Sequence, residues 1–381
     1  MISFYGVKNF KSLMSVGIKT TNLNVFMGLN SMGKSSVIQS MLALRQSFIQ
    51  MPFSGLESIN DKASEKTIRM VPQLFLKGEL VSLGLSKDVF CHNTGDKTIE
   101  FSIGEGDKGI LKFEYKYDNE SSLSLEGGLV NSLKIASFPS LFQKVRYLSA
   151  NHIGPQTVYE RQSAGVERFN ELGNGGEYAP FYLAEHGSEI LENEFLFHEK
   201  AKSNNLSHIL NAWLSEISPG TRLFAEKIPG FDLIKMAFQF ERNKDLSDPH
   251  LPVNVGFGLS YVMPLILSVL ISKPNDILII ENPESHLHPR GQAKMGRLLA
   301  LAAKSGVQIF CETHSDHILN GMRVAVKEGE LDKNKMCVYY FEKNENSNTK
   351  ITPIPIDENG ELELYPEGLL DEWGNLMERL I

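Results

Sequence analysis

The stretch GLNSMGKSS, which begins at Gly28, constrains the fold of this chain more than any other segment. It matches the pattern G-x-x-x-x-G-K-S through Gly33, Lys34 and Ser35. Glycines let the backbone curl so that its N–H groups face a phosphate, and the start of a helix adds partial positive charge. The pattern predicts a phosphate-binding loop in which Lys34 reaches the β- and γ-phosphates of a nucleotide and Ser35 ligates Mg²⁺.

The segments on both sides of this loop fit a strand, a loop and a helix in succession. An extended apolar stretch, LNVFM, precedes the loop. After the loop, apolar residues recur at near-helical spacing, namely Val37, Ile38, Met41, Leu42 and Leu44. The competing interpretation is a glycine-rich turn before an unrelated helix. Under it, the strand pattern before the loop and the helix pattern after it would both be coincidental.

A second predicted strand ends abruptly in polar residues, within ILIIENPESHLHP (Ile277 to Pro289). Its four apolar residues indicate a buried parallel strand, and Pro289 favours a helix start soon afterwards. In a nucleotide hydrolase such a strand usually ends in two adjacent acids, one for the metal ion and one for the attacking water. Here Glu281 fills the first place, but Asn282 fills the second.

Two further motifs lie around this strand in the sequence. NVGFGLSYVMPL (Asn254 to Leu265) places two glycines and Ser260 before an apolar helix, and such a helix start can bind an anion. An ordinary glycine-rich helix entry is the alternative interpretation. After the strand, VQIFCETH is predicted to be the neighbouring strand, and it ends at His314.

Taken in this order, the motifs resemble those of the ABC-type ATPases of the SMC, RecF and OLD (overcoming lysogenization defect) class. The resemblance covers VKNFKS, the phosphate loop and the segment from Asn254 to His317, with a looser match from Asn151 to Gln162. The wording NVGFG and ENPESHLHP is similar to that of short bacterial ATPases. Relatives of this kind often occur in phage-defence systems, Septu among them.

The resemblance implies that two subunits meet head to tail across two bound ATP molecules. One subunit would supply the phosphate loop, and the other would close its signature helix start over the γ-phosphate. A Q-loop glutamine is also implied, and Gln156 and Gln73 both remain candidates. The residues implied to contact nucleotide are Lys11, Gly28, Asn30, Gly33, Lys34, Ser35, Ser36, Gly256, Gly258 and Ser260.

The same resemblance assigns Glu281 to Mg²⁺ and leaves the water-activating place with Asn282. A neutral amide cannot act as a general base near pH 7. Either Glu284 takes over this role, assisted by His314 at the γ-phosphate, or hydrolysis is slow and the protein rests in an ATP-bound state. We expect slow hydrolysis, with Glu284 as the remaining catalytic acid.

A rival hypothesis is a hydrolytic metal site built from histidines and carboxylates that lie close together in sequence. The residues concerned are His286, His288, His314, His317, Glu281, Glu284, Glu312 and Asp316. The simpler interpretation makes His288 a packing residue beside Pro289 and His317 a solvent-facing helix residue.

The predicted fold is α/β, an ABC-type ATPase head with a mixed central sheet, an antiparallel hairpin-rich lobe and a helical lobe. The predicted segments are an N-terminal ATPase lobe (1–160), a mainly helical insert (161–250), the part with the later motifs (251–345) and an acidic tail (346–381). Alternation of apolar and polar residues predicts a hairpin from Phe101 to Asp118, and Pro180 to Gly220 is expected to be mainly helical.

Composition limits the class of protein further. The net charge of -8 argues against a constitutive nucleic-acid coat protein, and three widely spaced cysteines favour a reducing cytoplasm. No signal pattern or membrane span is expected. Only 67 residues follow His314, which is too few for the TOPRIM nuclease domain of OLD proteins. We therefore expect the output to pass through a partner.

The C-terminal segment from Asp357 to Ile381 has eight acids and one arginine, so its net charge is -7. Apolar residues at helical spacing predict an amphipathic helix at its end. Docking of this helix on the protein's own core is favoured slightly over a partner contact, and its acidity argues against contact with DNA.

These observations together predict a cytoplasmic ABC-type ATPase that dimerises on ATP and controls an effector, such as a nuclease, in defence against phage. One alternative is a regulatory module that binds ATP with negligible turnover. Another is a DNA-repair ATPase of the RecF kind that contacts DNA directly.

Overall fold

The computed structural model describes residues 1–50, 71, 73–91, 96–106, 109–117, 119–130, 140–142, 145–160, 172–242 and 245–380. The chain forms two compact units, and both are discontinuous in sequence. Unit 1 comprises Met1–Thr21, Met27–Lys144 and Tyr339–Pro353, and unit 2 comprises Asn22–Phe26, Val145–Val338 and Ile354–Ile381. Within the described residues no helix is long and apolar enough to cross a bilayer.

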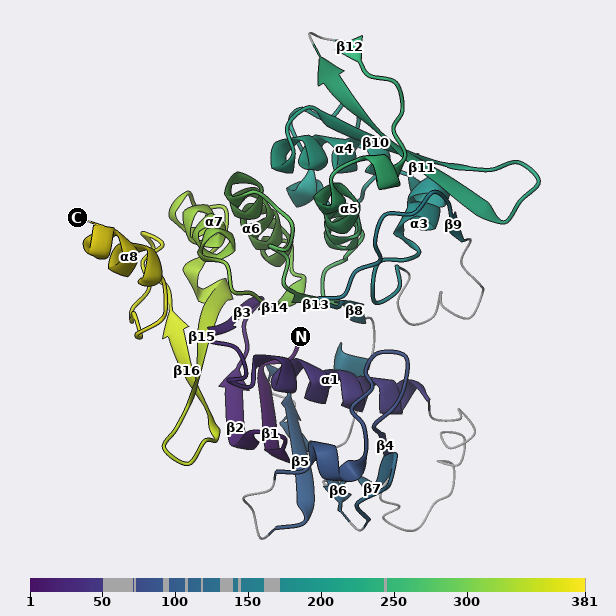
Figure 1. Ribbon diagram of the computed structural model, residues 1–381. Helices are drawn as coiled ribbons and strands as arrows, with labels where there is room; N and C mark the ends of the chain where they lie inside the picture. The colour runs from purple at the N-terminus through teal and green to yellow at the C-terminus, as the bar shows by residue number, and fades with distance from the viewer. Residues whose placement is uncertain are drawn as a thin grey trace. The chain divides into compact units, whose positions relative to one another are not determined.

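Unit 1 is built on an antiparallel sheet of six strands, in the order β2-β1-β5-β6-β7-β4 (Figure 1). The predicted hairpin is confirmed, because β5 pairs with β6 along its length. The strands are β1 (Phe4–Phe10), β2 (Leu13–Lys19), β4 (Gln73–Phe75), β5 (Thr98–Gly104), β6 (Ile110–Lys116) and β7 (Ser124–Leu129). The unit also holds α1 (Lys34–Ile49), the short α2 (Ser86–Val89), η3 (Ser140–Phe142) and most of the pair β15 (Met336–Lys343) and β16 (Thr349–Pro355).

Unit 2 contains the parallel strands, in the order β3-β14-β13-β8. They are β3 (Leu23–Gly28), β8 (Val145–Leu148), β13 (Ile277–Glu281) and β14 (Gln308–Glu312). The four apolar residues before Glu281 are fully buried, as expected for a strand covered on both faces. The helices α5 (Phe257–Leu270), α6 (Pro289–Lys304) and α7 (Asp316–Lys327) lie on one side of these strands (Figure 1).

Helices α6 and α7 pack unusually closely because two glycines face backbone. A Cβ at Gly296 would stand 2.2 Å from the Ile318 carbonyl oxygen, and one at Gly321 would stand 2.1 Å from that of Ala293. Pro289 is the first residue of α6, as predicted from the sequence. This close pair fixes the positions of the two turns that lead into α6 and α7.

The predicted helical insert (161–250) is wrong in its second half. Its described part begins with α3 (Ala179–His186), η5 (Glu194–Leu196) and α4 (Leu206–Ile217). It then continues as β10 (Thr221–Lys227), β11 (Leu233–Arg242) and β12 (Asp245–Leu246), which form an antiparallel sheet with β9 (Tyr159–Glu160) from just before the insert. The apolar–polar alternation of β10, buried at Leu223 and exposed at Glu226, is a strand signal that the helical interpretation overlooked.

The C-terminal amphipathic helix exists as α8 (Glu372–Leu380), but its apolar residues are not docked on a core. Leu376, Met377 and Leu380 are 46%, 38% and 79% exposed. By contrast, Leu369, just before the helix, is buried. The expectation that α8 packs on the protein's own core is therefore wrong for these residues.

The three cysteines, Cys91, Cys311 and Cys337, are all buried as free thiols. Burial raises the pKa of Cys311, and the nearby carboxylates of Glu284 and Glu312 raise it further.

Candidate functional site

The predicted phosphate loop lies in unit 1, between the end of β3 and the start of α1. Gly28 and Gly33 both have positive φ, 133° and 105°, which L side chains rarely adopt. A Cβ at Gly28 would stand 2.3 Å from the Phe341 carbonyl oxygen, and one at Gly33 would stand 2.3 Å from Thr349 Oγ1. The loop therefore requires glycine at both positions, and the predicted strand, loop and helix are confirmed.

The Lys34 side chain folds back onto this loop. Its Nζ donates hydrogen bonds to the carbonyl oxygens of Gly28 (2.7 Å) and Leu29 (2.9 Å), and the residue is 3% exposed. Ser35 and Asn30 are exposed, and Ser36 is half-buried. The ammonium is thus held in the curl of the loop by neutral acceptors, which a phosphate could replace with charged ones.

Two residues that the sequence analysis missed support the loop from outside. Thr349 Oγ1, at the start of β16, donates to the Met32 carbonyl oxygen (2.9 Å) and lies 2.8 Å from Ser12 Oγ. The Thr349 N–H also donates to the Ser12 carbonyl oxygen (3.0 Å). Thr349 is more than 300 residues from the loop, so no local pattern could have identified this contact.

Lys11, which the resemblance places near nucleotide, lies at the turn between β1 and β2 with φ 52°. Its Nζ donates to Gln39 Oε1 at 2.6 Å, on α1. Burial lowers the pKa of Lys11, and the negative charge of Asp88 opposes this shift. Lys11 therefore lies beside α1 at Gln39, four residues after Ser35.

The acidic strand end lies in unit 2. Glu281, the last residue of β13, is half-buried, and its Oε2 accepts a hydrogen bond from the Ala150 N–H (3.1 Å). Burial raises the pKa of Glu281, while hydrogen bonds from Ala150 and Tyr147 oppose the shift. In the parallel register Glu281 pairs with Glu312, which is 6% exposed. Two carboxylates thus end adjacent strands.

Asn282, in the place where a second acid is usual, has an unusual backbone. Its φ is 49°, a left-handed conformation that asparagine tolerates better than most residues. Its N–H donates to the Glu312 carbonyl oxygen (2.8 Å), and its carbonyl accepts from Tyr261 Oη (3.1 Å). Its side-chain Oδ1 is buried and has no hydrogen-bond partner among the described residues.

Both oxygens of the Glu284 carboxylate accept a hydrogen bond from residues that follow β14. Its Oε2 accepts from Thr313 Oγ1 (2.6 Å), and its Oε1 accepts from the His314 N–H (2.8 Å). Both oxygens therefore hold the end of β14, next to the exposed His314 side chain. The expectation that Glu284 is the catalytic acid stays a prediction, and these hydrogen bonds give the carboxylate a further role in positioning the turn around His314.

Gln292 and Ser315 extend this connection into the helices. Ser315 Oγ donates to Gln292 Oε1 (2.6 Å), and Ser315 Oγ also accepts from the first N–H groups of α7. Gln292 Nε2 donates to the carbonyl oxygens of Leu287 (2.9 Å) and Glu284 (3.3 Å). The turn after β13, the turn after β14 and the starts of α6 and α7 therefore form one hydrogen-bonded network.

The signature-like helix start also lies in unit 2, and it corrects one predicted contact. Gly256 is exposed, and a Cβ there would meet nothing within 4 Å. Gly258 is different, because its Cβ would stand 2.4 Å from the His286 carbonyl oxygen. Ser260 is 3% exposed, so it does not face outward as a contact with a second subunit would require.

Aromatic rings join this helix start to the turn after β13. His152 stacks on Tyr261 with centroids 3.8 Å apart, and the exposed Phe257 lies 4.6 Å from the His286 ring. His152 Nδ1 lies 3.1 Å from the Tyr261 carbonyl oxygen. Burial lowers the pKa of His152 to about 4, although its hydrogen bonds with Tyr261 and Ser149 oppose this.

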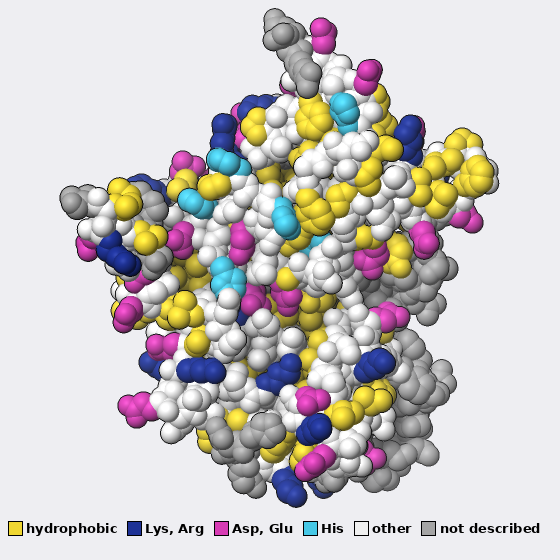
Figure 2. Space-filling view, viewed as in Figure 1, with side chains coloured by type: hydrophobic (Ala, Val, Ile, Leu, Met, Phe, Trp, Pro, Cys, Tyr) yellow, Lys and Arg dark blue, Asp and Glu magenta, His cyan; other side chains and the backbone are white. Residues whose placement is uncertain are grey.

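The histidines do not gather into a metal site. Among the described residues no group of three His, Cys, Asp or Glu side chains could hold a metal ion. The histidines visible in Figure 2 are spread over that face of the molecule rather than clustered. His288 caps α6, since its Nδ1 accepts from the Arg290 N–H (3.2 Å), and His317 is exposed on α7. The rival transition-metal hypothesis therefore has no geometric support in this part of the chain.

The two candidate Q-loop glutamines have different environments. Gln73 pairs with Glu126 in the antiparallel sheet of unit 1. Gln156 is exposed in unit 2, where its N–H donates to Tyr159 Oη (3.2 Å). Neither contact selects one of them as the Q-loop residue.

Comparison with known families gives a match over most of the chain. A family model described as "AAA domain, putative AbiEii toxin, Type IV TA system" matches residues 23–320. A second model, described as "Protein of unknown function (DUF3696)", matches residues 331–380. No curated protein matches the chain.

Solved structures similar to this chain include heads of SMC proteins. An SMC head bound to the C-terminal winged-helix domain of ScpA is 13% identical, with 93% of this chain and 98% of that chain covered and a TM-score of 0.50. The SMC head of Thermotoga maritima (13% identity, 93% and 99% covered) has a TM-score of 0.43. An SMC head bound to ScpA from Pyrococcus furiosus (13% identity, 100% and 99% covered) has one of 0.49. The first likeness confirms the predicted α/β ATPase-head fold.

Proposed function

The chain belongs to this AAA-domain family, and on that premise we propose that it is an ABC-type ATPase that assembles on ATP and controls a partner effector. The effector is a nuclease, and the setting is defence against phage. The family description names a toxin of a Type IV toxin–antitoxin system, and this supports a role in defence against phage. The observation that carries the proposal is the phosphate loop, with its two obligatory glycines and its enclosed Lys34.

Each residue of the loop has a distinct role in this proposal. The loop N–H groups and Lys34 bind the β- and γ-phosphates of ATP. The exposed Ser35 hydroxyl and the half-buried Glu281 carboxylate are oxygen ligands of the kind that Mg²⁺ prefers. The resemblance assigns each of them to Mg²⁺, an ion that when bound neutralises charge on the phosphates.

Hydrolysis is slow in this proposal, so ATP acts mainly as a switch. Asn282 provides no general base, and Glu284 is occupied by Thr313 and the His314 N–H. Glu284 is therefore a positioning residue for His314 and not the base. A module with negligible turnover is the limiting case of the same mechanism.

Assembly uses the start of α5 as the contact with a second subunit. Gly256 is the position to test, because it is exposed, whereas Ser260 is buried, and it has room for a side chain within its own subunit. Its φ of -58° is acceptable to any residue. A charged side chain at Gly256 should therefore leave the fold intact and still obstruct a partner.

The test measures mass by light scattering with and without ATP. Wild type and Gly374→Glu should both increase in mass with ATP, because a Cβ at Gly374 also meets nothing within 4 Å. Gly256→Glu should remain at the mass seen without ATP while binding ATP with unchanged affinity. If the protein assembles equally with and without ATP, and Gly256→Glu assembles as wild type does, the proposed mechanism is wrong. Salt-sensitive DNA binding that strengthens with ATP would instead favour the DNA-repair alternative.

A further inference from the structure

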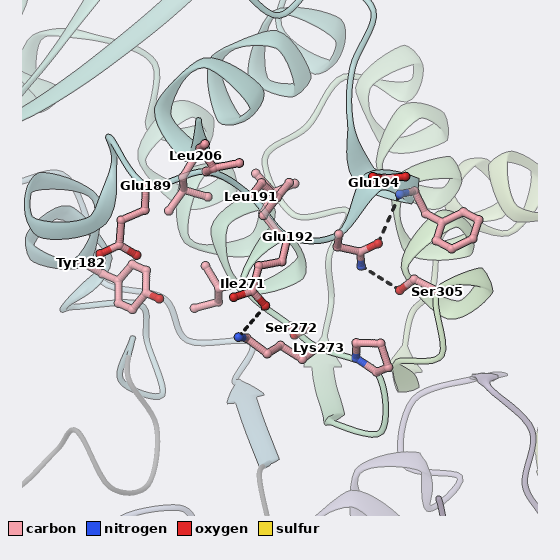
Figure 3. A pocket seen from close by; sticks show the side chains of 15 residues that line it. Tyr182, Glu189, Leu191, Glu192, Glu194, Leu206, Ile271, Ser272, Lys273 and Ser305 are labelled. Atoms are coloured by element: carbon pink, nitrogen blue, oxygen red, sulfur yellow. Dashed lines mark hydrogen bonds and ion pairs between the residues drawn. The ribbon is translucent and has the colours of Figure 1, made fainter. Parts of the chain in front are cut away.

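A groove in unit 2 that is lined by none of the nucleotide-motif residues has the size and lining of a binding site. Its volume is about 450 Å³. The segment from Glu189 to Phe195 forms one wall, and the end of α5 and the segment that follows it form the other (Figure 3). Tyr182 and Glu189 lie at one end, and Glu194 and Ser305 lie at the other. Sites of this volume can enclose several side chains of a ligand.

The floor of the groove is apolar, and exposed apolar side chains also line the groove. Leu191, Leu206 and Leu270 are buried in its floor. Ile190 is 75% exposed and Phe195 is 52% exposed, although both line the same groove. When a ligand covers exposed large apolar side chains beside an apolar hollow, more apolar surface is removed from water than in a polar groove, and this favours binding.

The charged groups of the lining are mainly negative. Glu189, Glu192 and Glu194 supply three carboxylates, and Lys273 supplies the one ammonium among the lining residues described. Lys273 Nζ is already paired with Glu192, at 2.7 Å. The lining therefore has a formal charge of -2, and Glu194 has no hydrogen bond or ion pair from its carboxylate among the described residues.

Hydrogen bonds hold the walls in place without a ligand. The Leu191 N–H donates to the Asn204 carbonyl oxygen (2.8 Å), and the Leu206 N–H donates to that of Glu189 (2.8 Å). Asn193 Nδ2 donates to Ser305 Oγ (2.9 Å), which ties the wall to the end of α6. A preformed groove loses little conformational entropy when it is filled.

We propose that this groove binds a segment of a protein partner in which a large apolar side chain is flanked by lysine or arginine. The apolar side chain enters between Phe195 and the leucine floor, and the flanking cations meet Glu189 and Glu194 at the two ends. Nucleic acids and fatty acids do not fit, because their negative groups would face three carboxylates. The identification of this partner with the effector rests on the proposed function, whereas peptide binding itself does not require ATP.

Selection from a random peptide display library tests the groove without knowledge of the partner. The bait is the full chain, either wild type or Glu189→Gln/Glu194→Gln/Phe195→Ser. Wild type should enrich peptides with an apolar residue between basic residues, and the triple variant should not. Absence of enrichment on wild type, or equal enrichment on both baits, would overturn the proposal.

Titration of an enriched peptide by fluorescence anisotropy then tests the chemistry. Phe195→Ser and Glu189→Gln/Glu194→Gln should each weaken binding about tenfold. The exposed control Glu345→Gln should change nothing, and added salt should weaken binding. An acidic version of the peptide, or a single-stranded oligonucleotide, that binds equally well would contradict the proposal. ATP affinity is measured on the same variants, and its retention separates failure of the groove from failure of the nucleotide site.

Discussion

The phosphate loop and the turn after β13 are held in contrasting ways. In the loop, Lys34 bonds to carbonyl oxygens five and six residues away. In the turn, Glu284 bonds to Thr313 and His314, which are about thirty residues away on another strand. The geometry of a motif held by local contacts can be predicted from the sequence of the motif itself. The geometry of a motif held by distant residues cannot, and its chemistry depends on which of its polar atoms those residues bind.

The largest expected effect tests the general base that is missing from the turn after β13. Asn282→Glu should raise steady-state phosphate release about 100-fold, because a well-placed general base contributes about 10²–10⁴-fold. The left-handed backbone at residue 282 should cost about 1 kcal/mol of folding stability in this variant. Asn282→Gln, which has the same length but no charge, should not raise the rate. Rapid wild-type hydrolysis that neither variant alters would show that the water is activated elsewhere.

The next effect tests the local contacts of the loop. Lys34→Ala should weaken ATP binding about 10- to 100-fold, because it removes charge-assisted hydrogen bonds worth about 1.5–3 kcal/mol. Isothermal titration calorimetry measures the affinity, and thermal unfolding checks that the loop still folds. Lys327→Ala, which removes an exposed lysine of α7, is the control. Unchanged affinity in Lys34→Ala would mean that nucleotide binds at another site.

A smaller effect separates a positioning role of Glu284 from a catalytic one. Glu284→Gln and Thr313→Val should each lower phosphate release three- to tenfold, because each breaks the bond that holds the end of β14. Thr313→Ser keeps the hydroxyl and should retain the wild-type rate. If Glu284 were the general base, Thr313→Val would have little effect and Glu284→Gln would abolish the pH dependence of the rate.

The turn region should also respond to acid through His152. The pKa of this histidine is lowered from 6.5 to about 4 in the folded state, so the unfolded state binds the extra proton as the pH falls below 6.5. Its contribution to stability is complete above pH 6.5 and is lost between pH 6.5 and 4. Urea unfolding should show a loss of about 1 kcal/mol from pH 6.5 to 5.5 in wild type. This part of the loss should be absent in His152→Phe, and an identical loss in both proteins would contradict the assignment.

The smallest effect concerns the distant support of the loop. Thr349→Val should weaken ATP binding two- to fivefold, since it removes the hydrogen bond to the Met32 carbonyl oxygen, worth about 0.5–1.5 kcal/mol. Thr349→Ser should bind ATP as wild type does. If Thr349→Val has no effect on ATP binding, the conformation of the loop is determined by its own residues alone. The difference between this loop and the turn after β13, which distant residues hold, is then larger.

The same contrast explains what could be predicted from the sequence. The loop, the strand before Glu281 and the start of α6 at Pro289 follow from glycine, apolar runs and proline, whose effects are local. The occupation of Glu284, the burial of Ser260 and the support by Thr349 depend on tertiary contacts. The antiparallel sheet of the insert was missed because the whole of 161–250 was assigned from its helical stretch, Pro180 to Gly220, although strands begin at Thr221.

The burial of all three cysteines has a practical consequence for observing assembly. Native thiols inside the fold react slowly with maleimides, and the raised pKa of Cys311 reduces its thiolate further. A single cysteine introduced at Gly374, where a Cβ also meets nothing within 4 Å and where the proposed assembly contact does not lie, would therefore take a fluorophore without removal of the native ones. Energy transfer between donor- and acceptor-labelled chains would then follow the meeting of two subunits in real time, as ATP is added and consumed.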